Sequence, residues 1–97
     1  MMDVHYEKDK RLIPYLIASN PQVSLVDTRN DNGVVFFGFS PAPIALELIS
    51  DFFTDQCPAM SPKRLFDAIE EFKTILYREK EKYRMMDGGN GYGNNYR

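Results

Sequence analysis

The chain has 97 residues, which is enough for one small domain with a modest hydrophobic core. Its formal net charge of −2 argues against a general electrostatic clamp on nucleic acid, which would normally be basic, although a local basic patch is compatible with it. The single cysteine, Cys57, cannot form a disulfide within the chain, and no apolar run resembles a signal-peptide core or reaches membrane-spanning length. We therefore expect a cytoplasmic protein without a membrane segment.

The first part of the chain predicts an N-terminal arm followed by a helix. Residues 1–8 have little periodicity and form either a frayed arm or a short extended segment, and the globular domain is expected over residues 9–86. Asp9 is a plausible N-cap of the first helix. The apolar residues after it repeat at helical spacing: Leu12, Ile13, Leu16 and Ile17. Pro14 lies just beyond the first turn counted from Asp9, so the helix either begins a residue or two later or is kinked.

The next segment predicts a β-hairpin whose second strand is apolar on both faces. Residues 22–28 form the first strand, 29–33 the connection and 34–39 the second strand, and we favour a longer loop over a two-residue turn. One face of the second strand carries Val34, Phe36 and Gly38, and the other carries Val35, Phe37 and Phe39. Both faces need a cover in water, because burying one Phe or Val side chain stabilises by about 1.5–3 kcal/mol. The helices could wrap both faces, a second copy could cover one of them in a symmetric dimer, or a non-protein ligand could bind there.

Two further helices and a tail complete the chain. Ser40 and Ser61 each precede a proline and are expected to cap the second and third helices. The buried stripe of the second helix is Ala45, Leu48, Ile49, Phe52 and Phe53. That of the third is Leu65, Ile69, Phe72 and Leu76, flanked by Phe66, Ala68 and Ile75. Residues 87–97 are low-complexity and are expected to be disordered. The element order predicts a single small α+β domain, helix–β-hairpin–helix–helix with antiparallel strands, which dimerisation could extend.

Three parts of this pattern carry a resemblance to a known family. They are a short helix that begins at Asp9, a hairpin with Asp-Asn-Gly at 31–33 before Val-Phe-Phe-Gly-Phe at 35–39, and a closing helix with Phe-Asp-Ala-Ile-Glu-Glu-Phe-Lys at 66–73. Over residues 9–78 the chain resembles a family of small domains of bacteria and bacteriophages. The resemblance implies the helix–hairpin–helix–helix fold and a bacterial or phage origin. Because that family has no assigned activity, it implies no catalytic residues.

Residue types suited to catalysis do not cluster in the sequence. His5 is the only histidine and has no partner at a fixed spacing, so neither a catalytic triad nor a histidine-based metal site is indicated. Cys57 could act as a nucleophile only if the fold brought a base to it. The glycines at 88–91 follow the last helix and lack the strand-then-helix context of a phosphate loop. We therefore expect a protein that binds without catalysis and needs neither cofactor nor metal.

Two binding functions follow from the remaining signals. The first is a protein-interaction module that forms a homodimer through its aromatic hairpin, with a candidate interface of Val26, Val35, Phe37 and Phe39. The second is an accessory single-stranded nucleic-acid binder that uses basic helix ends and tyrosines. Its candidate contacts are Lys10, Arg11, Arg78, Lys82, Tyr83 and Arg84. Against this second function, acids alternate with these bases, and pairs such as Glu79 with Lys82 indicate a solvated helix surface.

Overall fold

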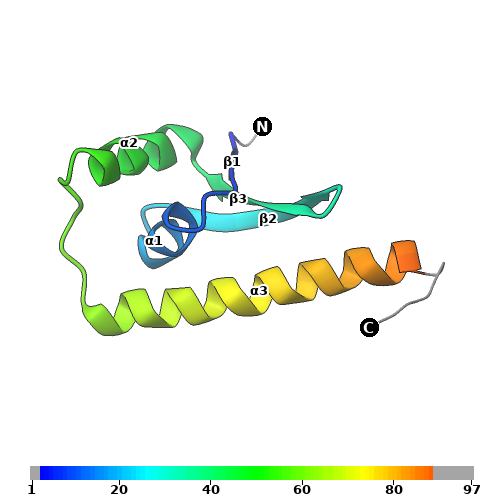
Figure 1. The fold of residues 1–97 in the computed structure, drawn as a ribbon. Coiled ribbons are helices and arrows are strands. Elements are labelled where there is room, and N and C mark those ends of the chain that lie inside the picture. The colour runs from blue at the N-terminus through cyan, green and yellow to red at the C-terminus, as the bar shows by residue number, and fades with distance from the viewer. Residues whose placement is uncertain (1–2, 89–97) are drawn as a thin grey trace.

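The computed structural model describes the backbone of residues 3–88 and the side chains of residues 3–82, so residues 89–97 of the predicted tail lie outside the described residues. Within this range the elements are β1 (His5–Glu7), α1 (Leu12–Ala18), β2 (Ser24–Asp31), β3 (Val34–Ser40), α2 (Ala42–Phe53) and α3 (Pro62–Gly88). The order of helix, hairpin and two helices is as predicted, and the fold is α+β with antiparallel strands. In Figure 1, α3 runs beneath α1 and the hairpin, and α2 lies on the upper side of the molecule.

The sheet has three strands in the order β1-β3-β2, so β3 is its central strand. The third strand comes from the N-terminal arm, where His5, Tyr6 and Glu7 pair antiparallel with Phe39, Gly38 and Phe37. Of the two forms expected for residues 1–8, the structure therefore shows a short extended segment at 5–7. A central strand has a neighbour on each side, which leaves β2 and β1 as the edges of this sheet.

The connection between β2 and β3 is shorter than predicted. It consists of Asn32 and Gly33 alone, with φ angles of 53° and 88°. Positive φ at both positions is typical of the type I′ turn that joins tightly paired, twisted strands, and Asn-Gly is the preferred sequence for it. The prediction of a longer loop over 29–33 was wrong, because Arg29, Asn30 and Asp31 continue β2 and pair with β3.

The helix boundaries follow from their caps. α1 begins at Leu12, which is two residues later than an N-cap at Asp9 predicts. The carbonyl oxygen of Asp9 accepts hydrogen bonds from the backbone N–H groups of Leu12 and Ile13, at 3.1 Å each. Pro14 is then in the first turn, where no intrahelical donor is lost. Ser61 Oγ accepts from the N–H of Arg64 at 3.2 Å, as predicted for the third helix.

Two predicted boundaries differ from the structure. Ser40 makes no side-chain cap for α2, because it is the last residue of β3 and Pro41 follows it at the cap position. α3 runs to Gly88, so Asp87 and Gly88 belong to the helix and not to the predicted tail.

The core lies between one face of the sheet and the helices. Its largest fully buried side chains are Phe37, Phe39, Ile13, Leu16 and Val23. The Phe37 ring packs against Phe72 of α3 with 5.3 Å between ring centroids. The prediction that Val35, Phe37 and Phe39 form an interface was therefore wrong. These three side chains are 5%, 0% and 0% exposed within a single chain, so a second copy cannot reach them.

On the opposite face of β3, the N-terminal segment covers Gly38, whereas Val34 near the turn is 45% exposed. Gly38 is buried beneath Tyr6 and Val4, so closely that a β-carbon at Gly38 would lie 2.8 Å from Tyr6 Cε1 and from Val4 Cγ1. Tyr6 Oη donates to Asp27 Oδ2 at 2.7 Å, and the Arg29 guanidinium lies over the Tyr6 ring at 4.6 Å from its centroid. This hydrogen bond lowers the pKa of Asp27 and raises that of Tyr6. The sequence predicted that helices, a second copy or a ligand would cover this part of β3. In the structure, β1 and the residues beside it cover it instead.

Candidate functional site

Two neighbouring cavities form the candidate site. The larger one opens between α1, the segment that follows α2 and the first half of α3. Its volume is about 470 Å³. Its walls are mainly apolar, formed by Pro14, Tyr15, Phe52, Met60, Leu65, Ile69 and Phe72. Lys10, Arg11 and Lys73 are the charged residues that line it. Leu65, Ile69 and Met60 are only half-buried, so this apolar surface is open to a ligand or partner.

A second, smaller cavity lies next to the first. Its volume is about 220 Å³, and it opens between the hairpin turn, the residues before α1 and the second half of α3. Its apolar lining comes from Ile13, Val34, Val35, Phe72 and Leu76. Three lysines complete it: Lys8, Lys10 and Lys80. Because Lys10 and Phe72 line both cavities, the two are neighbours, and we call them together the basic furrow.

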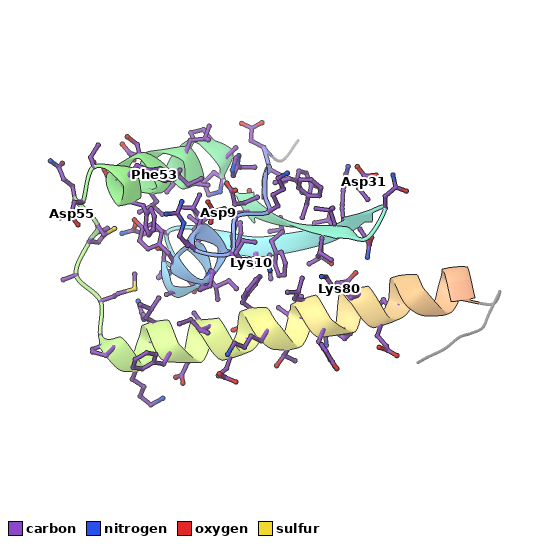
Figure 2. The ribbon with its side chains drawn as sticks, in the orientation of Figure 1. Asp9, Lys10, Asp31, Phe53, Asp55 and Lys80 are labelled. Carbon is purple, nitrogen blue, oxygen red and sulfur yellow. The ribbon has the colours of Figure 1, made fainter. Side chains whose placement is uncertain are left out.

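The charges of the basic furrow have one sign. Its charged residues are Lys8, Lys10, Arg11, Lys73 and Lys80, and among the described side chains no Asp or Glu lines either cavity. This contrasts with the whole chain, whose formal net charge is −2. Figure 2 labels Lys10 before α1 and Lys80 on the side of α3 that faces the hairpin.

Only some of these cations are neutralised by neighbours. Arg11 Nη2 lies 3.3 Å from Asp9 Oδ2, which lowers the pKa of Asp9, and Lys73 Nζ lies 3.8 Å from Glu70 Oε2. Within the part of the chain that the structure describes, the ammonium groups of Lys8, Lys10 and Lys80 have no acidic partner. The furrow therefore combines apolar walls with positive charge that is free to attract an anion.

The structure divides the predicted nucleic-acid contacts between two surfaces. Lys10 and Arg11 are in the basic furrow, whereas Arg78 and Lys82 line a separate hollow on the outer side of α3. This division follows from helix geometry, since Arg78 is two residues from Leu76 and about 200° around the helix from it. Lys82 pairs with Glu79 at 3.1 Å, as predicted. Tyr83 and Arg84 are on α3, but their side chains lie outside the described residues.

The fourth predicted interface residue has a different environment from the other three. Val26 is 43% exposed, and it lies at an irregularity in the pairing of β2 with β3, between Leu25 and Asp27. Val26 is therefore accessible on the edge strand β2. It does not belong to the aromatic surface predicted for the interface, because the other three residues of that surface are buried.

The candidate contacts chosen from the sequence did not include Lys8, Lys73 and Lys80, although Lys8 is close to Lys10 and Arg11 and Lys80 lies between Arg78 and Lys82. For two of them a signal was present: Ile69, Lys73, Leu76 and Lys80 recur at spacings of three and four residues, which places them on one side of a helix. Only the tertiary fold shows that this side faces Lys8 and Lys10.

Two titratable groups of the furrow, Tyr15 and Cys57, lie next to each other. Cys57 is an exposed free thiol that lines the larger cavity. Burial, together with the neighbouring Cys57, raises the pKa of Tyr15 well above its usual range, so its phenol stays protonated and cannot serve as a base. Tyr15 Oη instead donates to the carbonyl of Leu48 at 3.0 Å. His5 is paired with Glu7 at 2.9 Å and lines neither cavity.

Comparison with known proteins adds no family to this picture. No protein-family model, curated protein or solved structure matches the chain. The resemblance to a family of bacterial and phage domains stays a prediction. Among the described residues, no helix has the length and apolar character needed to cross a membrane, and no group of three or more His, Cys, Asp or Glu side chains is placed to hold a metal ion.

Proposed function

We propose that the protein is a non-enzymatic interaction module that holds a segment of a partner protein in the basic furrow. The observation that carries this proposal is the coincidence of an open apolar cavity of about 470 Å³ with charged residues of a single sign. Open apolar surface that the chain does not bury itself is typical of binding sites. The cytoplasmic location and the bacterial or phage origin remain part of the proposal, supported by the single cysteine and by the family resemblance.

Self-association through the hairpin has less support than binding in the furrow. Three of the four side chains predicted for that dimer are internal, and Val26 alone is accessible. A dimer formed through the hairpin would have to use its exposed side chains, such as Val26 and Val34.

Single-stranded nucleic acid is the second candidate partner of the furrow. Lys8, Lys10 and Lys80, which lack acidic partners among the described residues, favour it because ammonium groups bind phosphates. Against it, Arg78 and Lys82 lie outside the furrow, so the predicted basic contacts do not form one continuous track. Binding to phosphates would weaken steeply with added salt, which a titration with a labelled oligonucleotide would show.

Site-specific photo-crosslinking tests the proposed function. A photoreactive phenylalanine analogue replaces Leu65, which lines the furrow, or Leu46, which is 52% exposed on α2 and lines neither cavity of it. In cells that naturally make the protein, irradiation should give a discrete protein adduct from position 65 and none from position 46. The absence of an adduct from position 65, or the same adducts from both positions, would contradict the proposal.

A further inference from the structure

We infer that the segment held in the basic furrow is an acidic amphipathic helix of a partner protein, with apolar side chains on one face and Asp or Glu beside them. This inference rests on the proposed function and specifies the chemistry of the partner. It follows from the charge of the furrow, the kind of walls it has and its length.

The charge of the furrow selects an acidic occupant. Five cations line it and no carboxylate does, and Lys8, Lys10 and Lys80 have no acidic partner among the described residues. Such a surface attracts a negatively charged segment and repels a positively charged one, because like charges held together across an interface are strongly unfavourable.

The walls of the furrow favour a helix over an extended strand. Two long walls of the furrow come from α1 and α3, whose backbone groups are already paired within each helix. At Val34 and Val35, where β3 reaches the furrow, one edge of the strand is paired with Asp31 and Asn30 of β2, and β1 pairs with the other edge only from Phe37 to Phe39. Along α1 and α3 an extended segment would bury its own N–H and C=O groups without partners, whereas a helix satisfies them internally.

The length of the furrow sets the size of the helix. Its α3 wall runs from Leu65 to Lys80, which is sixteen residues, and the fifteen steps between them at a rise of 1.5 Å give about 22 Å. A partner helix of about four turns would therefore lie along the whole furrow. Its apolar side chains would contact Leu65, Ile69 and Leu76, and its carboxylates would lie near Lys10, Lys73 and Lys80.

Segments of this chain itself fit the furrow less well. Residues 89–97 contain no Asp or Glu, so they do not supply the required charge. α2 is acidic, with Glu47 and Asp51 and no Lys or Arg, but its large exposed apolar side chains are Leu46 and Phe53. These two are seven residues apart, about 10.5 Å along the helix axis, which covers about half of the furrow.

Fluorescence anisotropy with two designed peptides tests the inference on the full chain. The first peptide is a labelled sixteen-residue amphipathic helix of Leu and Glu, and the second is identical except that Lys replaces every Glu. The acidic peptide should bind, its affinity should fall as salt rises, and the basic peptide should bind at least about tenfold more weakly. Equal binding of the two peptides, or binding that ignores salt, would overturn the inference.

Charge-reversal variants locate the binding. Lys10→Glu combined with Lys80→Glu should lower the affinity for the acidic peptide about tenfold, because it replaces two attractive ion pairs with two repulsive ones. Arg78→Glu combined with Lys82→Glu is the matched control: it makes the same charge change on α3 but outside the furrow, and it should leave the affinity within about twofold. If the double variant unfolds, Lys10→Gln with Lys80→Gln removes the same charges without adding repulsion. Unchanged affinity in the folded variants would overturn the inference.

Two other results would assign the furrow to a different occupant and so overturn the inference. One is tighter binding of a labelled fifteen-nucleotide single-stranded DNA than of the acidic peptide. The other is a doubling of the molar mass with rising protein concentration that the Lys10→Glu, Lys80→Glu variant abolishes, which would indicate a second copy. A position-65 adduct together with no preference for the acidic peptide would leave the proposed function standing and reject only the acidic helix.

Discussion

Replacing Phe37 by alanine distinguishes a core residue from an interface residue. Phe37 is 0% exposed and its ring packs 5.3 Å from that of Phe72, so the variant loses both the burial of a phenyl group and its contacts with α3. The transfer of such a side chain from water is worth about 1.5–3 kcal/mol, and the cavity left behind raises the expected loss to about 3–5 kcal/mol. Small domains have a total stability of about 5–15 kcal/mol, so Phe37→Ala should remove a large fraction of it.

Urea unfolding followed by circular dichroism measures this loss, at two protein concentrations that differ about tenfold. The matched control is Phe66→Ala, whose side chain is 63% exposed on α3 and should change the free energy of unfolding by no more than about 0.5 kcal/mol. A core role predicts a lower urea midpoint for Phe37→Ala that does not depend on protein concentration. If the variant instead kept the stability of the folded chain and halved the molar mass in light scattering, Phe37 would be an interface residue and its placement in the core would be refuted.

Three further substitutions test the sheet and its turn. Gly38→Ala would bring a methyl group within 2.8 Å of Tyr6 and Val4, so overpacking should cost about 1–3 kcal/mol and speed amide exchange in β1; an unchanged melting temperature would contradict the tight cover of Gly38. Gly33→Ala places an alanine at a φ of 88° and should cost about 1–2 kcal/mol in urea unfolding, whereas no loss would argue against the two-residue turn. Asp27→Asn tests the hydrogen bond from Tyr6, which lowers the pKa of Asp27 below its ordinary value of 3.8. That interaction stabilises the fold above about pH 4 and is lost as the pH falls through the lowered pKa of Asp27. Between about pH 6 and pH 3, the melting temperature of the variant should therefore fall by less than that of the wild type. An equal fall for both proteins would contradict this.

Local patterns in the sequence predict the main elements because those patterns have a direct structural cause. The 3.6-residue period places Leu12, Ile13 and Leu16 on the buried side of α1, and the hydroxyl of Ser61 caps α3 as expected. The alternation along β3 correctly separates the face of Phe37 and Phe39 from that of Gly38. These features depend on residues within a few positions of each other, and so they can be read without the tertiary structure.

The missed features depend on contacts between distant parts of the chain. β1 is only three residues long, too short for a period to be detected, and it exists because His5, Tyr6 and Glu7 pair with the free edge of β3. The sequence predicted only part of the furrow, because it identified Lys10 and Arg11 as candidate contacts. Lys80 lies near them only because α3 runs alongside the hairpin (Figure 1). Sequence spacing gives the side of a helix on which a lysine lies, and not what that side faces.

The central position of β3 changes what its two apolar faces mean. An edge strand has an in-sheet neighbour on one side only, so fewer neighbouring side chains are available to lie over its faces. A central strand has neighbours on both sides, and their side chains can close over it: Tyr6 from β1 lies over Gly38, held by Asp27 from β2. Glycine at 38 makes this possible, since a larger residue would occupy the space of the Tyr6 ring. Apolar side chains on both faces of a strand are therefore weak evidence for self-association until its place in the sheet is known. The half-buried Leu65 and Ile69 beside Lys73 are better evidence for a partner, because the segment that follows α2 passes along them without burying them.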